Sequence, residues 1–251
     1  CDAGICPTQF QRDQIPKCFH EKVAVMPDGI DTDYYSPARS APPPAPGLEF
    51  LAERELVTYV ARGMEPYRGF PEFMQALEIV LRERPGAHAV VVGEDRVAYG
   101  RRLAEGDSYK QRALSERRLD WTRVHFTGLL PRPQYRAVLQ ASSVHVYLTI
   151  PFVLSWSLLE AMSAGTAIVA SDVAPVREVA DGEPKAAQLV DMRRPEEVAA
   201  AIIGLLSDRT GATQMGDAAR ARILERNQAR DAWRRKAAWL ENLTFGRAAP
   251  R

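Results

Sequence analysis

The chain has 251 residues, of which 46% are hydrophobic and 26% charged, and 33 basic against 32 acidic residues give a formal net charge of +1. These values are ordinary for a globular protein, and without a basic excess they do not favour binding to nucleic acid. We expect neither a membrane span nor a signal peptide, because no apolar run approaches the length of a span and no signal sequence is recognisable. The cysteines, all at or before Cys18, fit a reducing compartment better than a disulfide framework.

The predicted elements begin with a helix over 8–14 and a strand over 22–26, which ends at a Pro-Asp-Gly turn over 27–29. Five prolines within 36–47 predict a linker or surface loop, because proline lacks the backbone N–H that sheets and helices need. Short apolar runs then alternate regularly with amphipathic stretches. The predicted strands span 56–61, 87–92, 123–126, 144–148, 167–170 and 186–190, and the predicted helices span 70–84, 109–118, 132–140, 157–164 and 176–180.

The strand runs are rich in Val, Ile and Ala without alternation, which is typical of a parallel sheet buried on both faces. Their alternation with helices predicts an α/β fold with a doubly wound parallel sheet, Rossmann-like in its connections. Three extra C-terminal helices are predicted over 196–206, 218–225 and 230–240. Such a sheet binds ligands at the carboxyl ends of its strands. The informative residues should therefore follow the strands directly.

The first candidate segment, 61–69, follows the predicted strand 56–61 and leads directly into a predicted helix. Arg62 and Arg68 flank a turn that contains Gly and Pro. The planar guanidinium suits phosphate oxygens, and the helix N-terminus adds amide donors. The alternative is a pair of solvated arginines in a surface loop. Neither a Walker sequence nor a GxGxxG motif is present, which excludes a P-loop and a standard dinucleotide site.

The second candidate segment, 149–162, follows the predicted strand 144–148 and runs into a helix that Ser155 or Ser157 can cap. Glu160 lies inside this otherwise apolar segment. A carboxylate in such surroundings needs hydrogen-bond donors, and the two hydroxyls of a ribose would supply them. The alternative is a glutamate that only stabilises the helix.

The residues from Ser157 to Val173 closely resemble the signature of family 4 glycosyltransferases (glycosyl transferases group 1). Around this signature, further segments are similar to other parts of the same family, and the likeness extends from about residue 5 to residue 205. These segments are Arg62 with Arg68-Gly69, Phe126-Thr127-Gly128 with the turn after it, 175–179, and 27–31 at the crossing between domains.

This resemblance implies one half of a GT-B enzyme, the C-terminal domain that binds the donor of a retaining glycosyltransferase. The enzyme would transfer a sugar from a nucleoside-diphosphate sugar to a glycan, lipid or small-molecule acceptor, as in polysaccharide biosynthesis. We expect residues 1–26 to be the tail of a missing N-terminal acceptor domain with the crossing, 27–227 the nucleotide-sugar-binding domain, and 228–251 a C-terminal helix and tail. No metal or other cofactor is expected. The expected location is cytoplasmic, either free or peripheral at the inner face of a membrane.

By the same resemblance Arg62, Arg68 and Glu160 are the catalytic residues, with the arginines on the donor diphosphate and Glu160 on the ribose. Two positions depart from the family pattern. Arg68 stands where lysine is usual, and Phe152 stands where the first of two acids contacts hydroxyls of the sugar. The implied donor-binding residues are Arg62, Gly63, Arg68, Phe126, Thr127, Phe152, Val153, Leu154, Ser155 and Glu160.

Other interpretations remain open at this point. A homologue that lost catalysis with the acid at Phe152 would be a binding module, and a GT-B-fold epimerase would need further acidic and histidine residues that are not evident. Asp31 and Asp33 look like a metal-binding aspartate pair, but they do not follow a central strand, so we reject that reading. His125 and His145 lie in predicted strands and are expected to be core or edge residues.

Overall fold

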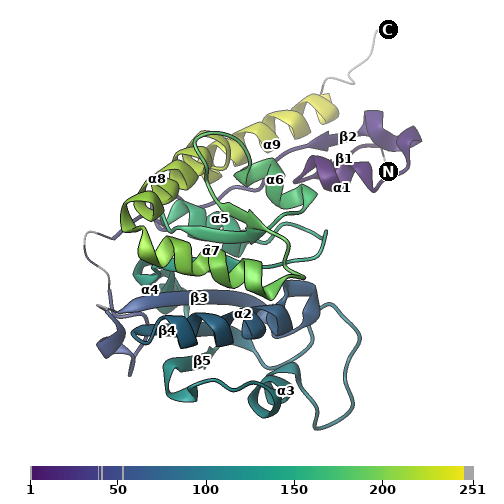
Figure 1. Ribbon diagram of the computed structural model, residues 1–251. Coiled ribbons are helices and arrows are strands. Elements are labelled where there is room, and N and C mark those ends of the chain that lie inside the picture. Colours follow the sequence, from purple (N-terminus) through teal and green to yellow (C-terminus); the bar gives the residue numbers. More distant parts are fainter. Residues whose placement is uncertain (1, 39, 41, 53, 246–251) are drawn as a thin grey trace, which may run out of the picture.

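The computed structural model describes residues 2–38, 40, 42–52 and 54–245. Their main sheet is parallel and has six strands in the order β5-β4-β3-β6-β7-β8 (Figure 1). The chain therefore starts in the middle of the sheet and winds outward in both directions, which confirms the predicted doubly wound fold. The strands are β3 (Glu55–Gly63), β4 (Ala87–Glu94), β5 (Val124–Gly128), β6 (Val144–Tyr147), β7 (Ile168–Ser171) and β8 (Gln188–Val190).

Helices cover both faces of this sheet. α2 (Phe70–Glu83) and α7 (Pro195–Ser207) pack together on one face, in front of the strands in Figure 1, with α3 (Tyr109–Glu116) beside α2. The other face is covered by α4 (Arg132–Ala141), α5 (Trp156–Ser163) and α6 (Ala174–Ala180), and α8 (Arg209–Arg226) packs on α5.

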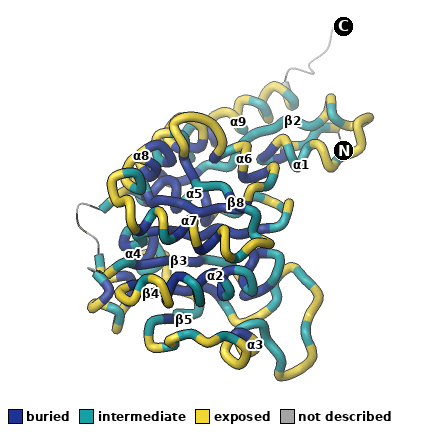
Figure 2. The backbone as a smooth tube through the Cα atoms, viewed as in Figure 1, coloured by how far each residue is buried: buried dark blue, intermediate teal, exposed yellow. Residues whose placement is uncertain are grey.

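The core consists of two apolar layers that share the strands. Successive side chains of a strand point to opposite faces, so Val57 and Tyr59 join the layer under α2 and α7 while Leu56 and Val60 face the other side. Figure 2 shows the central strands in dark blue, the colour of buried residues, over most of their length. This double burial explains why the strand sequences are apolar without alternation.

The N-terminal residues form a small separate sheet. Its two parallel strands are β1 (Gly4–Cys6) and β2 (Val23–Val25), joined through α1 (Gln9–Asp13) and a 3-10 helix, Lys17–Lys22. The carboxylate of Glu178 in α6 accepts the backbone N–H groups of Gln9 and Phe10 at 2.7 and 2.6 Å, which ties α1 to the main body.

The last helix, α9 (Ala229–Phe245), returns to the segment after β2. The nitrogen of Ala229 donates to the carbonyl of Ile30 at 2.9 Å, and Lys236 pairs with Asp28 at 3.2 Å. The yellow helix therefore lies at the same end of the molecule as the purple N-terminal sheet in Figure 1.

The predicted elements are present with small shifts in their ends, and one prediction was wrong in its extent. α8 begins at Arg209, well before the predicted start at residue 218. The missed first half contains glycines, which lower helix propensity. Tertiary packing overrides this preference, because Gly216 lies so close to Gly165 that a Cβ would collide with the carbonyl of Gly165.

Candidate functional site

The two candidate segments meet at the carboxyl edge of the sheet. β3 ends at Gly63 and its neighbour β6 ends at Tyr147, so the turns that follow them lie side by side. The carbonyl of Tyr67 accepts hydrogen bonds from the nitrogen of Ile150 at 3.2 Å and from Oγ1 of Thr149 at 3.4 Å. Residues 61–69 and 149–162 therefore form one surface, as the topology of a parallel sheet predicts.

Arg68 ends a 3-10 turn, Pro66–Arg68, between β3 and α2. The next residue, Gly69, has φ +62°, and a Cβ there would lie 2.5 Å from Cβ of Leu148. Only glycine combines this left-handed conformation with so close an approach. The Arg-Gly pair of the sequence motif thus fixes the direction in which the Arg68 side chain leaves the turn.

The guanidinium of Arg68 is almost completely buried, with 5% of the residue exposed. Nη1 donates to the hydroxyl of Tyr147 at 2.8 Å and to Oγ1 of Thr149 at 2.9 Å, while Nη2 donates to the carbonyl of Val153 at 3.1 Å. All three acceptors are neutral. Within the described ranges no carboxylate lies at ion-pair distance from Arg68. A buried charge is costly unless an opposite charge compensates it, so this site is suited to an anionic ligand.

The hydroxyl of Tyr147 connects Arg68 to the start of α5. It also accepts the backbone N–H of Ser155 at 3.0 Å. Ser155 is the N-cap of α5, since its hydroxyl accepts the N–H of Ser157 at 3.3 Å. The structure confirms Ser155 as the predicted cap and holds the segment around Val153 beside Arg68.

Glu160 lies in α5 and is half-buried. Its Oε2 accepts a hydrogen bond from the hydroxyl of Tyr135 in α4 at 2.6 Å. Burial raises the pKa of Glu160 above its ordinary value, while hydrogen bonds from Tyr135 and Tyr35 and the charge of Arg132 act in the opposite direction. The carboxylate is thus held in an aromatic environment.

Several other predicted residues form no hydrogen bond with Arg68 or Glu160. Arg62 is exposed at the end of β3, and its side chain makes no hydrogen bond or ion pair with any described residue. Gly63 is buried, and a Cβ there would collide with the carbonyl of Arg96. Phe126 lies under Lys110, whose Nζ is 4.6 Å from the ring centroid.

Thr127, next to Phe126 in β5, uses its hydroxyl on neighbouring backbone carbonyls, those of Val91 and Gly128 at 3.4 and 3.1 Å. Neither Phe126 nor Thr127 bonds to Arg68 or Glu160. Leu154 is half-buried and packs in the apolar layer around α5.

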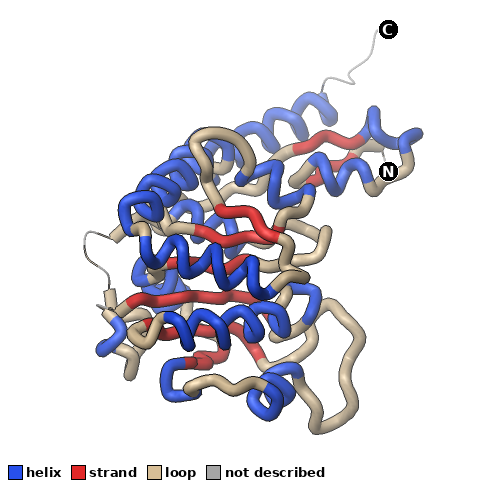
Figure 3. Tube along the Cα trace, in the orientation of Figure 1, coloured by secondary structure: helices blue, strands red, loops and turns tan. Residues whose placement is uncertain are grey.

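Sequence reasoning missed several residues of this edge. Glu65 lies inside the first candidate segment, 61–69, and is completely buried. Nothing in the sequence of that segment indicated what its carboxylate would contact. Tyr147 ends the strand whose carboxyl end was predicted to matter, and that position was the available signal. Tyr99 comes from the long loop between β4 and α3, drawn in tan in Figure 3, and no sequence pattern pointed to it.

Two of the remaining titratable candidates, Asp31 and His145, have structural partners. Asp31 accepts the N–H of Tyr34 at 3.0 Å and lies 3.6 Å from Arg132. His145 is completely buried beside Thr58, as expected of a core residue. Among the residues that the structure places, no three His, Cys, Asp or Glu side chains gather as a metal site would require. No helix in the described part of the chain is long and apolar enough to cross a membrane.

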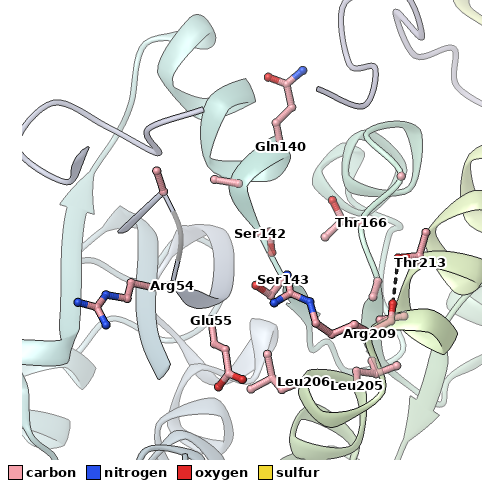
Figure 4. Close-up of a pocket in the computed structure, with 15 residues that line it drawn as sticks. Arg54, Glu55, Gln140, Ser142, Ser143, Thr166, Leu205, Leu206, Arg209 and Thr213 are labelled. Atoms are coloured by element: carbon pink, nitrogen blue, oxygen red, sulfur yellow. Dashed lines mark hydrogen bonds between the residues drawn. The ribbon is translucent and has the colours of Figure 1, made fainter. Parts of the chain in front are cut away.

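A separate hollow of about 250 Å³ lies at the opposite, amino edge of the sheet (Figure 4). It is lined in part by Arg54, Ser143, Thr166 and Arg209. Its hydroxyls already have protein partners, since Ser143 accepts the N–H of Leu56 at 3.0 Å and Thr166 donates to a carbonyl at 3.0 Å. The carboxyl edge, where ligands of doubly wound sheets bind, carries the buried unpaired cation instead.

Comparison with known proteins gives two family matches. Residues 54–208 match the family described as Glycosyl transferases group 1, and residues 1–35 match the family described as Glycosyl transferase family 4 group. Alpha-maltose-1-phosphate synthase of Mycolicibacterium smegmatis is 30% identical over 242 residues, which cover 89% of this chain and 59% of that protein.

Solved structures share the fold. HepE from Anabaena, in complex with UDP-glucose, superposes with a TM-score of 0.82 at 19% identity, covering 96% of this chain and 64% of HepE. Sucrose-phosphate synthase from Thermosynechococcus elongatus gives 0.73 at 21% identity, with coverage of 96% and 58%. The C-terminal domain of a glycosyl transferase group 1 family protein from Francisella tularensis gives 0.65 at 18% identity, covering 80% of this chain and 99% of that domain.

Proposed function

Because this chain belongs to the glycosyl transferases group 1 family, we propose that it binds a nucleoside-diphosphate sugar as the donor-binding half of a retaining GT-B glycosyltransferase. The observation that carries this proposal is the buried guanidinium of Arg68 at the carboxyl edge of the sheet, which has three neutral acceptors and no carboxylate of a described residue at ion-pair distance. The complex of HepE with UDP-glucose supports a donor of this class.

In this proposal the donor diphosphate binds at Arg68 and supplies the negative charge that compensates its buried guanidinium. When the bond between the anomeric carbon and the diphosphate oxygen breaks, negative charge grows on the leaving diphosphate. A cation already fixed by Tyr147, Thr149 and Val153 stabilises that charge without reorganising. Arg62, exposed at the end of β3 and without an ion pair to any described residue, would add a second positive charge from the solvent side.

Glu160 would bind the ribose. Its Oε2 already accepts the hydroxyl of Tyr135, and a carboxylate has further lone pairs for the ribose hydroxyls. Tyr135 fixes the orientation of the carboxylate, so little conformational freedom would be lost when the nucleotide binds.

The acceptor would bind to a second domain. The chain spans 59% of the Mycolicibacterium relative and 64% of HepE. We propose that this second domain orients a hydroxyl of a glycan, lipid or small-molecule acceptor across the cleft. Such orientation accounts for ~7–11 kcal/mol of a barrier. The 251-residue chain by itself is therefore expected to bind donor nucleotide and to transfer sugar only in traces.

A binding module without transferase activity is the second candidate, and Phe152 favours it, because an apolar ring stands where the family pattern has an acid. The two candidates share the donor site and differ only in catalysis. Transfer by the chain together with its acceptor domain would exclude the binding module.

The donor site can be tested with UDP, GDP, ADP and dTDP in a thermal-shift assay, each with and without EDTA. A diphosphate present at about 100 times its Kd stabilises the fold by ~2.7 kcal/mol. We expect one diphosphate to raise Tm and EDTA to leave the shift unchanged, since we propose a donor site that needs no metal. Arg209→Met at the opposite edge is the control and should keep the shift. No change in Tm with any diphosphate would refute the proposal.

A further inference from the structure

Thr149 provides one of the three acceptors of the Arg68 guanidinium, and the direction of that hydrogen bond is fixed. The hydroxyl of Thr149 shares its only proton between the backbone carbonyls of Ile150 at 2.9 Å and Tyr67 at 3.4 Å. It can therefore only accept the hydrogen bond from Nη1 of Arg68 at 2.9 Å. Thr149 is 1% exposed, so water has little access to these contacts.

The backbone of Thr149 is held by Ser171, the last residue of β7. In the parallel ladder between β6 and β7 the nitrogen of His145 donates to the carbonyl of Ala167 at 2.8 Å. Further along the same register, the nitrogen of Thr149 would meet the carbonyl of Ser171. It donates instead to the hydroxyl of Ser171, at 2.8 Å.

The carbonyl of Ser171 is engaged elsewhere. It accepts the nitrogen of Val173 at 2.9 Å, a bond between residues two apart that is common at the ends of strands. The nitrogen of Asp172, between them, donates to the carbonyl of Val190 in β8 at 2.8 Å. The backbone ladder between β6 and β7 therefore stops at this point, and the side chain of Ser171 takes the place of its carbonyl.

This substitution of a side chain for the backbone makes the hydroxyl of Ser171 necessary. Ser171 is as buried as Thr149, and buried backbone N–H groups are almost always paired. Without the hydroxyl, the nitrogen of Thr149 would have to move to find another acceptor. Such a movement would displace the hydroxyl of Thr149, and with it an acceptor of the Arg68 guanidinium.

Two rings also lie beside this guanidinium, but they do not set its direction. Cζ of Arg68 lies 5.5 Å from the ring centroid of Tyr99 and 5.4 Å from that of Phe152. A ring attracts a cation to its face, whereas an arginine that binds phosphate must align two N–H groups with two oxygens. The hydrogen-bond acceptors, Thr149 among them, therefore determine where the remaining N–H groups of Arg68 point.

We infer that Ser171 is a positioning residue of the donor site: by holding the backbone of Thr149, it orients the Arg68 guanidinium for the donor diphosphate. Ser171 makes no hydrogen bond with Arg68 itself, so it acts through Thr149. This inference rests on the proposed donor site and adds a third strand to it, because β3, β6 and β7 then all contribute to the position of the cation.

The test measures Kd by calorimetric titration of the 251-residue chain with whichever of UDP, GDP, ADP and dTDP binds. We expect Ser171→Ala to raise Kd roughly 2- to 30-fold, as residues that influence a site without touching its ligand do. Ser143→Ala is the matched control. Its hydroxyl accepts the N–H of Leu56 at 3.0 Å in the same way, but at the opposite edge of the sheet, so Kd should not change.

A double-mutant cycle with Arg68→Lys separates positioning from a general loss of stability. If Ser171 acts through the guanidinium, Ser171→Ala should raise Kd in the unmodified chain and have no further effect once Arg68 is replaced. If Ser171→Ala does not fold, Ser171→Cys carries the same cycle, because a thiol has a similar shape and is a weaker acceptor.

Three results would overturn the inference. An unchanged Kd for the Ser171 variant would show that the site does not need this hydroxyl. An equal rise in Kd for Ser143→Ala, or equal factors with and without Arg68→Lys, would show that lost stability weakens binding. Both of these results leave the donor site standing. If the unmodified chain binds none of the four diphosphates, the proposed donor site itself fails, and the role of Ser171 falls with it.

Discussion

Nη1 of Arg68 donates a hydrogen bond to the hydroxyl of Tyr147 over 2.8 Å, and this contact joins the ends of two adjacent parallel strands. Tyr147 is the last residue of β6, and Arg68 closes the turn after β3. The same hydroxyl accepts the N–H of Ser155 at the start of α5. The guanidinium of Arg68 is therefore held in place by β6 and the segment after it before any ligand arrives.

Replacing Tyr147 with Phe removes this shared acceptor and leaves the ring in the core. Arg68 loses a buried hydrogen bond, and the N–H of Ser155 loses a partly buried one. We expect the free energy of unfolding to fall by ~1–3 kcal/mol and nucleoside diphosphate binding to weaken as well. Urea denaturation and calorimetric titration measure the two effects. Full stability and full affinity together would show that the hydroxyl does not organise the site.

Replacing Arg68 with Lys tests the geometry of the cation with its charge kept. An ammonium cannot reproduce the planar fork that reaches Tyr147, Thr149 and Val153 at once. We expect the affinity for the nucleoside diphosphate, read as Kd by titration, to fall about tenfold or more, as the loss of a charged hydrogen bond would cause. Arg209→Lys at the opposite edge is the matched control and should bind normally. An unchanged Kd for Arg68→Lys would mean that the ligand does not need the guanidinium.

Replacing Glu160 with Gln should weaken the nucleoside diphosphate by roughly tenfold to a hundredfold, because hydrogen bonds to a charged group contribute ~1.5–3 kcal/mol. The amide retains the shape of the side chain but offers only one acceptor oxygen. Far-ultraviolet circular dichroism checks the fold, and Kd gives the effect. A loss of stability with unchanged affinity would instead assign Glu160 a structural role.

Glu160 also predicts a pH dependence of binding. Burial raises the pKa of its carboxyl, and only the ionised form accepts two ribose hydroxyls. Affinity should therefore be full at neutral pH and decline on acidification at a higher pH than for an ordinary glutamate. Titrations between pH 7 and pH 5 measure this decline, which Glu160→Gln should lack.

His145 predicts a different pH effect, on stability. Burial lowers the pKa of His145 to about 4, so the folded chain keeps it neutral where the unfolded chain protonates it. Stability from this group is complete above the unfolded pKa of about 6.5 and is lost as pH falls toward 4, by roughly 3 kcal/mol in total.

Urea denaturation measures the stability of the unmodified chain and of His145→Gln at pH 7 and at pH 5. The variant should be less sensitive to the change of pH, because Gln does not titrate. An equal loss of stability in both proteins would show that other groups cause the acid sensitivity.

Much of the fold could be predicted because it depends on local patterns. The apolar strands such as 87–92 and the helices between them follow directly from burial on both faces of a parallel sheet. The first half of α8 could not be predicted, since its glycines disfavour a helix and the tertiary contact of Gly216 with Gly165 is not visible in the sequence.

The site was predictable in part, because the local sequence pattern also predicts which segments follow the strands. Arg68 and Ser155 lie in the segments that follow two neighbouring strands, so the topology brings those segments together. Tyr99 and the anchoring of its loop by Glu65 depend on a contact between residues more than thirty positions apart, which no sequence spacing encodes. The partner of Glu160, Tyr135, likewise comes from a different helix.

The most direct test of the donor site is a crystal structure of the chain with the nucleoside diphosphate that stabilises it. We predict phosphate oxygens within hydrogen-bond distance of the Arg68 guanidinium, and ribose hydroxyls on the carboxylate of Glu160. A nucleotide bound in the hollow beside Arg54 and Arg209, at the opposite edge of the sheet, would contradict the account.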